Sequence, residues 1–307
     1  MRKALLAPLG LLLGAVAAAL VWTAWRHVAP HRERGLRLPE LDLPEEVRFR
    51  SRDGTGLFGL LLPGREGYPG LVLCHGYFRS LAEPLEVGLR LNQAGYHILL
   101  FDFRGCGRSG GRFTTIGYKE TWDVLAAVGL MKSRLGPAPI GVLGISMGAA
   151  AAIMAAAQTL DIAALVADSP YAHLEGVMRK RLPELAPLRW MVPFGWLSVL
   201  IGQLLSGCRL NSIRPVDHVG RLSPRPVLFI YGQRDSYIPP DQPCGLFAAA
   251  GEPKTMWVAP GSDHAVARLD HPEEYVRQVL GFFDRHLLGP AAGEEGRAIP
   301  ASPPQRL

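Results

Sequence analysis

The chain has 307 residues, of which 48% are hydrophobic, and a formal net charge of +6. This length suits one α/β domain of roughly 250 residues better than two small domains. The positive charge does not indicate a nucleic-acid partner, because residues 1–37 hold six basic residues and one acidic residue and the rest of the chain is almost neutral. The four cysteines have no metal-binding spacing, and no phosphate-binding loop or nucleic-acid motif is present in the sequence.

Residues 4–25 form a run of 22 residues without a charge, ALLAPLGLLLGAVAAALVWTAW. A helix of this length can cross a hydrocarbon core of about 30 Å. A cleaved signal peptide is the alternative, since Ala17 and Ala19 resemble a cleavage site, but the apolar run continues past them and favours an uncleaved single-pass anchor. Basic residues flank both ends, and the arginines after the run favour a cytoplasmic catalytic domain. We expect residues 1–37 to be a membrane anchor and basic linker that can be removed without loss of catalysis.

Residues 38–288 carry the patterns of one catalytic domain. VRFRS and GLFGLLL flank Asp53-Gly54-Thr55 and predict a β-hairpin. Six further strands are predicted at 71–74, 97–103, 140–145, 163–168, 226–232 and 254–259. Most are continuous apolar runs, which is typical of parallel strands covered by helices on both faces. The intervening helices are expected at 82–94, 119–134, 147–160, 241–250 and 272–287.

Ser146 lies between two glycines in LGISMGA, directly after a predicted strand and before the small-residue run AAAAIMAAA. A strand that turns at once into a helix leaves its corner residue in a cramped conformation and needs neighbours with almost no side chain two positions away. Gly144 and Gly148 meet that need. Such a turn would hold the serine hydroxyl at the carboxyl end of the strand, although an ordinary tight turn in a chain with 35 glycines has the same spacing.

Residues 170–224 separate two predicted strands by far more chain than one connecting helix needs. The charge-free stretch 190–208 within this segment has 19 residues, enough to consider a second membrane span. Pro193 and Gly195 weaken that interpretation, and a span here would put Ser146 and its partners on opposite sides of the bilayer. We therefore expect 170–224 to form a helical cap over the active end of the sheet.

An activated serine needs a base within hydrogen-bond reach and a third group that orients the base. After a strand–turn–helix nucleophile, the acid and then the histidine are expected in loops that follow later strands. Asp235 follows PVLFIYG, and His264 follows KTMWVA. Asp168 also ends a strand and is the rival acid, whereas Asp263 is adjacent to His264 in the chain and poorly placed to orient it.

Two backbone N–H groups are expected to stabilise the oxyanion of the reaction. Met147, which follows the nucleophile, supplies the first. The loop HGYF after the strand at 71–74 supplies the second, from Tyr77 or alternatively from Phe78. We expect His75 in the same loop to be structural rather than a catalytic base.

Five motifs in order, HGYF, DFRGCGRSGG, GISMG, GQRD and GSDHA, make residues 45–288 resemble the α/β-hydrolase superfamily. Within it, FDFRGCGRSGGRFTTIGYKETWDVLAAV is similar to the serine aminopeptidase-like and membrane-anchored α/β-hydrolase-domain group. The resemblance implies a mostly parallel eight-stranded sheet with helices on both faces and a short helical cap. The tail at 289–307, rich in Gly, Pro and polar residues, is predicted to be disordered.

The resemblance also implies Ser146, Asp235 and His264 as nucleophile, acid and base, with Tyr77 and Met147 forming the oxyanion hole. Cys106 departs from the histidine or other polar residue that is common in RGxG, but this position shapes a loop and does no chemistry. No cofactor is implied.

Three functions remain open at this point. The favoured one is a serine hydrolase that cleaves carboxylic esters or thioesters with an apolar acyl group, from small or lipid-like substrates, through an acyl-enzyme. The second is an amidase or peptidase of the serine aminopeptidase type, although no amine-binding carboxylate pair is evident. The third is a binding module on the same fold, which would be expected to lack a member of the triad, and none is missing.

Overall fold

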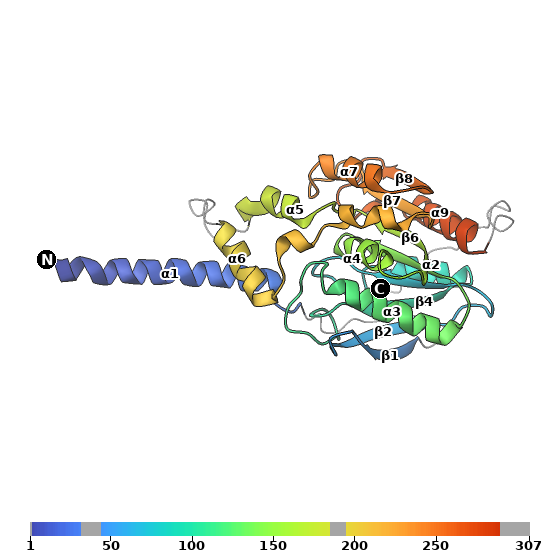
Figure 1. Cartoon of the computed structure of the whole chain (residues 1–307), viewed down its shortest axis with the longest axis horizontal. Coiled ribbons are helices and arrows are strands. Elements are labelled where there is room, and N and C mark those ends of the chain that lie inside the picture. The colour runs from blue at the N-terminus through green and yellow to red at the C-terminus, as the bar shows by residue number, and fades with distance from the viewer. Residues whose placement is uncertain (1, 32–43, 185–194, 289–307) are drawn as a thin grey trace.

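The computed structural model describes residues 2–31, 44–184 and 195–288 (Figure 1). Its strands form one eight-stranded sheet in the order β1-β2-β4-β3-β5-β6-β7-β8. The strands are β1 Glu45–Arg50, β2 Gly56–Leu62, β3 Gly70–Cys74, β4 His97–Asp102, β5 Ile140–Ile145, β6 Ile162–Asp168, β7 Val227–Gly232 and β8 Lys254–Ala259. The β1–β2 hairpin and the β2–β4 pair are antiparallel and every other pair is parallel, which confirms the predicted mostly parallel sheet.

Helices cover both faces of this sheet. They are α2 Leu85–Gln93, α3 Glu120–Leu135, α4 Met147–Ala156, α7 Asp241–Ala249, α8 Ala267–Asp270 and α9 Pro272–Phe283, the last continued by a π-helical turn at Asp284–Leu288. Because side chains alternate along a strand, β3 contributes to a core on each face. Val72 packs in the cluster with α3 and α4, while Leu71 and Leu73 pack in the cluster with α2 and α9. The predicted layered α/β architecture is thus confirmed.

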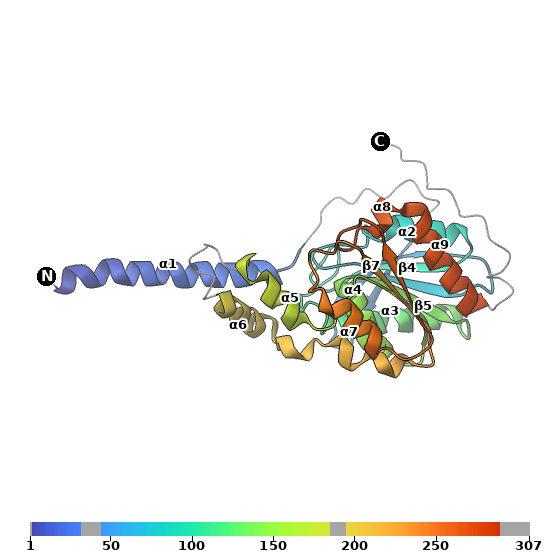
Figure 2. The ribbon, with the colours of Figure 1, turned by 90° about the horizontal axis from the view of Figure 1, so that it is seen from above.

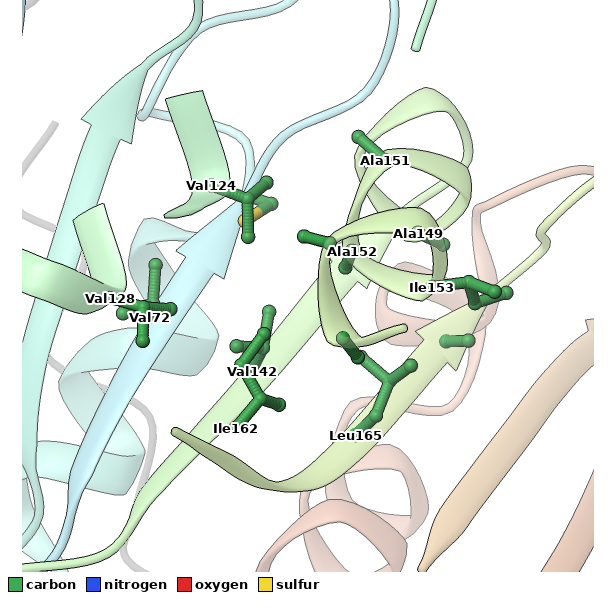
Figure 3. Close-up of a cluster of buried hydrophobic side chains, with 14 of the residues drawn as sticks. Val72, Val124, Val128, Val142, Ala149, Ala151, Ala152, Ile153, Ile162 and Leu165 are labelled. Atoms are coloured by element: carbon green, nitrogen blue, oxygen red, sulfur yellow. The ribbon is translucent and has the colours of Figure 1, made fainter. Parts of the chain in front are cut away.

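Small residues on α4 set the distance between that helix and the sheet. Ala149 and Ala152 face Val142 and Leu165 of the strands below, as Figure 3 shows, and all four side chains are fully buried or nearly so. Methyl groups on the helix let its axis lie close to the branched side chains of the strands without leaving a void. The run of alanines after Ser146 therefore brings the beginning of α4 close to the carboxyl ends of β3 and β5.

The segment between β6 and β7 is largely helical where it is described. It contains α5 Leu174–Arg181, α6 Gly195–Ser206 and short 3₁₀ turns at Leu182–Glu184, Leu210–Ser212, Pro215–Asp217 and Val219–Leu222. Residues 185–194, which include part of the charge-free stretch, lie outside the described residues. The predicted tail at 289–307 also lies outside them.

The N-terminal helix α1, Arg2–Val28, differs from the membrane anchor that the sequence predicts. In the part of the chain that the structure describes, no helix has both the length and the apolarity needed to span a bilayer. The predicted single-pass anchor and the membrane localisation are therefore wrong. The predicted cytoplasmic orientation of the catalytic domain depended on that anchor and is withdrawn with it. Two apolar side chains of the 4–25 run, Leu20 and Ala24, are buried, as is Val28 at the end of the helix.

The C-terminal part of α1 packs on α6, which lies beside it in both views (Figures 1 and 2). Residues four apart share one helix face, and Ser198, Gly202 and Ser206 form a buried small-residue face on α6. A Cβ added to Gly202 would lie 3.6 Å from Cγ1 of Val28, and the Ser198 hydroxyl donates to the Leu20 carbonyl oxygen at 3.3 Å. The end of α1 is thereby attached to the cap.

A buried charge network lies beneath the antiparallel edge of the sheet. Arg104, of the DFRGCGRSGG motif, is 3% exposed. Its guanidinium donates to both carboxylate oxygens of the fully buried Asp123, at 2.6 and 2.9 Å, and to Asp53 at 2.7 Å. It also donates to the hydroxyl of Ser51 at 2.9 Å. The network ties the β1–β2 hairpin to α3.

We expect Arg104→Met to lower the free energy of unfolding by about 3–5 kcal/mol, because it leaves the Asp123 carboxylate buried without its partner. Urea titration followed by circular dichroism measures the change. Arg134→Met is the matched control, since Arg134 pairs with Glu45 at the surface and such a pair contributes about 0–1 kcal/mol. Equal losses for the two variants would contradict this account of the network.

Candidate active site

Ser146 occupies a strained turn between β5 and α4. Its backbone φ is 51°, in the left-handed region that side-chain-bearing residues rarely adopt. A Cβ on Gly144 would lie 2.6 Å from the Ala149 nitrogen, and one on Gly148 would lie 2.5 Å from the carbonyl oxygens of Cys74 and His75. The two glycines therefore let the turn close against α4 and β3, as the motif predicts.

The structure brings Ser146, His264 and Asp235 together in one hydrogen-bonded chain. Ser146 Oγ lies 2.9 Å from His264 Nε2, and His264 Nδ1 lies 2.8 Å from Asp235 Oδ2. The Asp235 side chain is 8% exposed and that of His264 is 17% exposed. With Nδ1 donating to the carboxylate, Nε2 is left to accept the serine proton.

Backbone and side-chain contacts hold Asp235 and His264 in place. The other carboxylate oxygen of Asp235 accepts the N–H groups of Tyr237 and Ile238 at 2.9 and 2.8 Å. The ring of Tyr237 stacks on that of His264 with 4.8 Å between centroids. The guanidinium of Arg181, in α5, lies over the Tyr237 ring, 4.4 Å from its centroid. The His264 ring is thus held by a hydrogen bond at Nδ1 and by the ring of Tyr237 on its face.

Asp263 joins the two loops rather than orienting the base. Its carboxylate accepts the backbone N–H groups of Ser236 and His264, each at 2.7 Å, and the Ser236 hydroxyl at 3.0 Å. The hydrogen bonds from Ser236 and His264 lower the pKa of Asp263 below its usual value. Asp263 therefore clamps the acid loop to the base loop from the solvent side.

Asp168, the rival acid, has no hydrogen bond to His264. It is fully buried, and its carboxylate accepts the hydroxyls of Ser169 at 2.9 Å and Tyr275 at 3.0 Å. Burial raises the pKa of Asp168. Because Ser169 Oγ in turn accepts the N–H of Ala265 at 3.1 Å, Asp168 supports the loop that carries the base.

His75 and the candidate oxyanion donors occupy the loop after β3 and the start of α4. His75 is fully buried, with Nδ1 2.7 Å from the Gly76 carbonyl oxygen and Nε2 accepting the Phe103 N–H at 3.0 Å. Both ring nitrogens therefore form hydrogen bonds with backbone groups. The Gly76 N–H is occupied by Glu83 at 2.6 Å, which leaves Tyr77 as the next donor in the loop. Met147 is the first residue of α4, where N–H groups lack intrahelical acceptors.

A cleft of about 500 Å³ opens over this arrangement. Ser146, His264 and Tyr77 contribute to its walls, together with apolar surface from Val266 and Leu269. A second, mostly apolar cavity of about 60 Å³ lies between α1, α5 and α6 and is not lined by Ser146 or His264. The cleft that Ser146 and His264 line is therefore the candidate substrate site.

Sequence reasoning missed an ion pair in the wall of the cleft. Glu83, which holds the Gly76 N–H, also accepts a hydrogen bond from Arg268 at 3.2 Å. Arg268 donates as well to the carbonyl oxygen of Ala265, the residue after the base. Neither residue belongs to a recognisable motif, so only their positions in space connect the HGYF loop with the loop of His264.

Comparisons with known proteins show the fold family of the chain. Residues 69–190 match the family model described as alpha/beta hydrolase fold. An uncharacterized protein of Mycobacterium tuberculosis (strain ATCC 25618 / H37Rv) is 33% identical over 223 residues, which cover 71% of this chain and 72% of the relative. The uncharacterized protein YqkD of Bacillus subtilis (strain 168) is 29% identical over 218 residues, 70% of each chain.

Among solved structures, an esterase of Pyrococcus furiosus superposes with a TM-score of 0.71 at 28% identity, covering 85% of this chain and 98% of that one.

We expect Gly148→Ala to lower stability by about 1–3 kcal/mol and to reduce covalent labelling of Ser146, because the added methyl group must push α4 away from the backbone of β3. Thermal unfolding and fluorophosphonate labelling measure the two effects. Gly281→Ala in α9 is the control, since a Cβ there meets nothing within 4 Å. A Gly148→Ala variant as stable and as reactive as the control would refute the steric role of this glycine.

Proposed function

The chain belongs to the alpha/beta-hydrolase family, and we propose that it is a serine hydrolase that cleaves carboxylic esters or thioesters through an acyl-enzyme. The observation that carries the proposal is the continuous chain of hydrogen bonds from Ser146 through His264 to Asp235, at 2.9 and 2.8 Å, in the wall of an open cleft. The likeness to an esterase of known structure supports the reaction class.

In the proposed first step, Ser146 Oγ attacks the carbonyl carbon of the substrate while His264 Nε2 accepts the hydroxyl proton. The carbonyl oxygen becomes an oxyanion that the backbone N–H groups of Tyr77 and Met147 stabilise. Asp235 stabilises the imidazolium that forms and keeps the ring in the required orientation. Collapse of the tetrahedral intermediate breaks the bond to the leaving alkoxide or thiolate, which takes the proton from His264.

The acyl-enzyme is then hydrolysed by the reverse sequence. His264 removes a proton from a water molecule, the resulting hydroxide attacks the acyl carbon, and the second tetrahedral intermediate expels Ser146 Oγ, which regains its proton. The carboxylic acid product leaves the cleft. Apolar side chains of Val266 and Leu269 in the cleft wall support an apolar acyl group.

Ser146→Ala is expected to abolish fluorophosphonate labelling and to lower kcat on p-nitrophenyl esters by a factor on the order of 10⁶, because it removes the nucleophile. Thermal unfolding is expected to change little, since alanine fits among the small residues of this turn. The assay runs matched ester, thioester and amide substrates with acyl chains of graded length. Full activity in the variant, or hydrolysis of the amide alone, would overturn the proposal.

Asp235→Asn is expected to lower kcat by a factor on the order of 10⁴, because an amide favours the wrong tautomer of the histidine and cannot stabilise the imidazolium that forms. Asp168→Asn is the matched comparison: it changes a carboxylate at the end of the neighbouring strand that has no hydrogen bond to His264. Steady-state kinetics on one ester decide between them. A larger loss of kcat for Asp168→Asn than for Asp235→Asn would transfer the acid role to Asp168.

A further inference from the structure

The end of α1 is in contact with the loop that carries the proposed oxyanion donor. The Tyr77 hydroxyl donates a hydrogen bond to the carbonyl oxygen of His27, in the last turn of the helix. The ring of His31 stacks on that of Phe78 with 5.4 Å between centroids. Val28, the last residue of α1, accepts the N–H of Thr114 at 3.0 Å. Three contacts thus join one helix end to the surroundings of the nucleophile.

These contacts follow from the way a helix ends. The last four carbonyl groups of an α-helix have no intrahelical donor and carry the negative end of the helix dipole. At α1, the Tyr77 hydroxyl and the Thr114 N–H supply two of the missing donors. Burial raises the pKa of Tyr77 well above its usual value, so the phenol remains a neutral donor. The helix and the active-site loop therefore satisfy each other's polar groups.

The loop itself needs such a tether. Tyr77 lies between Gly76, which has no side chain to restrict it, and Phe78, whose φ is 53°. On one side, Glu83 holds the Gly76 N–H at 2.6 Å. On the other side, the hydroxyl of Tyr77 fixes the residue whose backbone N–H is the proposed oxyanion donor. A displacement of about 1 Å at such a donor can cost about 100-fold in rate.

We propose that α1 is a positioning element of the oxyanion hole, acting through the hydrogen bond from the Tyr77 hydroxyl to the His27 carbonyl oxygen. The inference rests on the proposed function for its catalytic consequence. It differs from the expectation that residues 1–37 can be removed without loss of catalysis, because the helix now contributes to the geometry of the site. Tyr77 has a double role, with the backbone binding the oxyanion and the side chain setting its position.

Two full-length variants test the inference. Tyr77→Phe keeps the ring that stacks on Phe78 and removes only the hydroxyl. Ala24→Arg puts a long charged side chain at a position that is 2% exposed and lines the small apolar cavity between α1, α5 and α6, which displaces the helix. Their controls are Tyr118→Phe, a half-buried tyrosine outside the cleft, and Val21→Arg, on the face of α1 where Val21 is 48% exposed.

The kinetic readout separates positioning from a general loss of structure. We expect both variants to lower kcat by about 10- to 100-fold with KM and the pH profile of kcat/KM unchanged. The Ki of an alkyl trifluoromethyl ketone should rise by the same factor, because Ser146 Oγ adds to its carbonyl carbon and leaves an oxyanion in the hole. The controls should behave as the unmodified chain. An unchanged kcat and Ki in Tyr77→Phe would overturn the inference while leaving the proposed function intact.

Hydrogen exchange provides a second readout that does not depend on turnover. The peptide covering residues 75–81 should exchange faster in both variants and not in the controls. If the unmodified chain hydrolyses no ester, the proposed function fails, and the exchange data still decide whether α1 holds the loop. Unchanged exchange at 75–81 in Ala24→Arg, with faster exchange in α1 itself, would show that the helix can leave without disturbing the loop and would overturn the inference.

Discussion

The left-handed backbone at Ser146 is the constraint around which the rest of the site is arranged. A residue with φ of 51° is stable only when its surroundings determine its conformation, and here they do so from three sides. The Ser146 N–H donates to the Asp168 carbonyl oxygen at 2.7 Å, while Gly144 and Gly148 let α4 and β3 approach the turn. The small side chains of α4 serve the same end, because they allow the helix to lie close to the sheet.

The same local constraint explains why the motifs could be predicted from the sequence. The turn requires glycine at two fixed positions, and the loops must follow buried strands. Both features therefore produce patterns that can be recognised in the sequence. Asp235 and His264 were predicted in this way, because β7 and β8 are recognisable in the sequence and the two residues lie in the loops that follow them. No sequence pattern predicts the contacts of Tyr237, Glu83 and Arg268. Their partners come from loops distant in sequence, and their roles depend on side-chain contacts alone.

The prediction of a membrane anchor at the N-terminal helix was wrong for a related reason. A helix that packs on a neighbouring helix and a helix that crosses a bilayer can share a long apolar composition, and length without charge does not distinguish them. The distinguishing feature belongs to α6, where Ser198, Gly202 and Ser206 form a face of small residues that contacts Leu20 and Val28. That complementarity joins segments that are almost 180 residues apart, so no window of the sequence contains both halves of it.

The proposed chemistry requires the oxyanion donor and the base to keep a fixed separation although they belong to different loops. Glu83 and Arg268 meet this requirement from within the cleft wall, since one holds the Gly76 N–H and the other the Ala265 carbonyl oxygen. Asp263 and Asp168 brace the base loop on its two sides, through Ser236 and Ser169. Side chains that take no part in the proposed proton transfers thus link the loops that follow β3, β7 and β8, and donors held in place in this way can stabilise charge in the transition state without rearranging as the reaction proceeds.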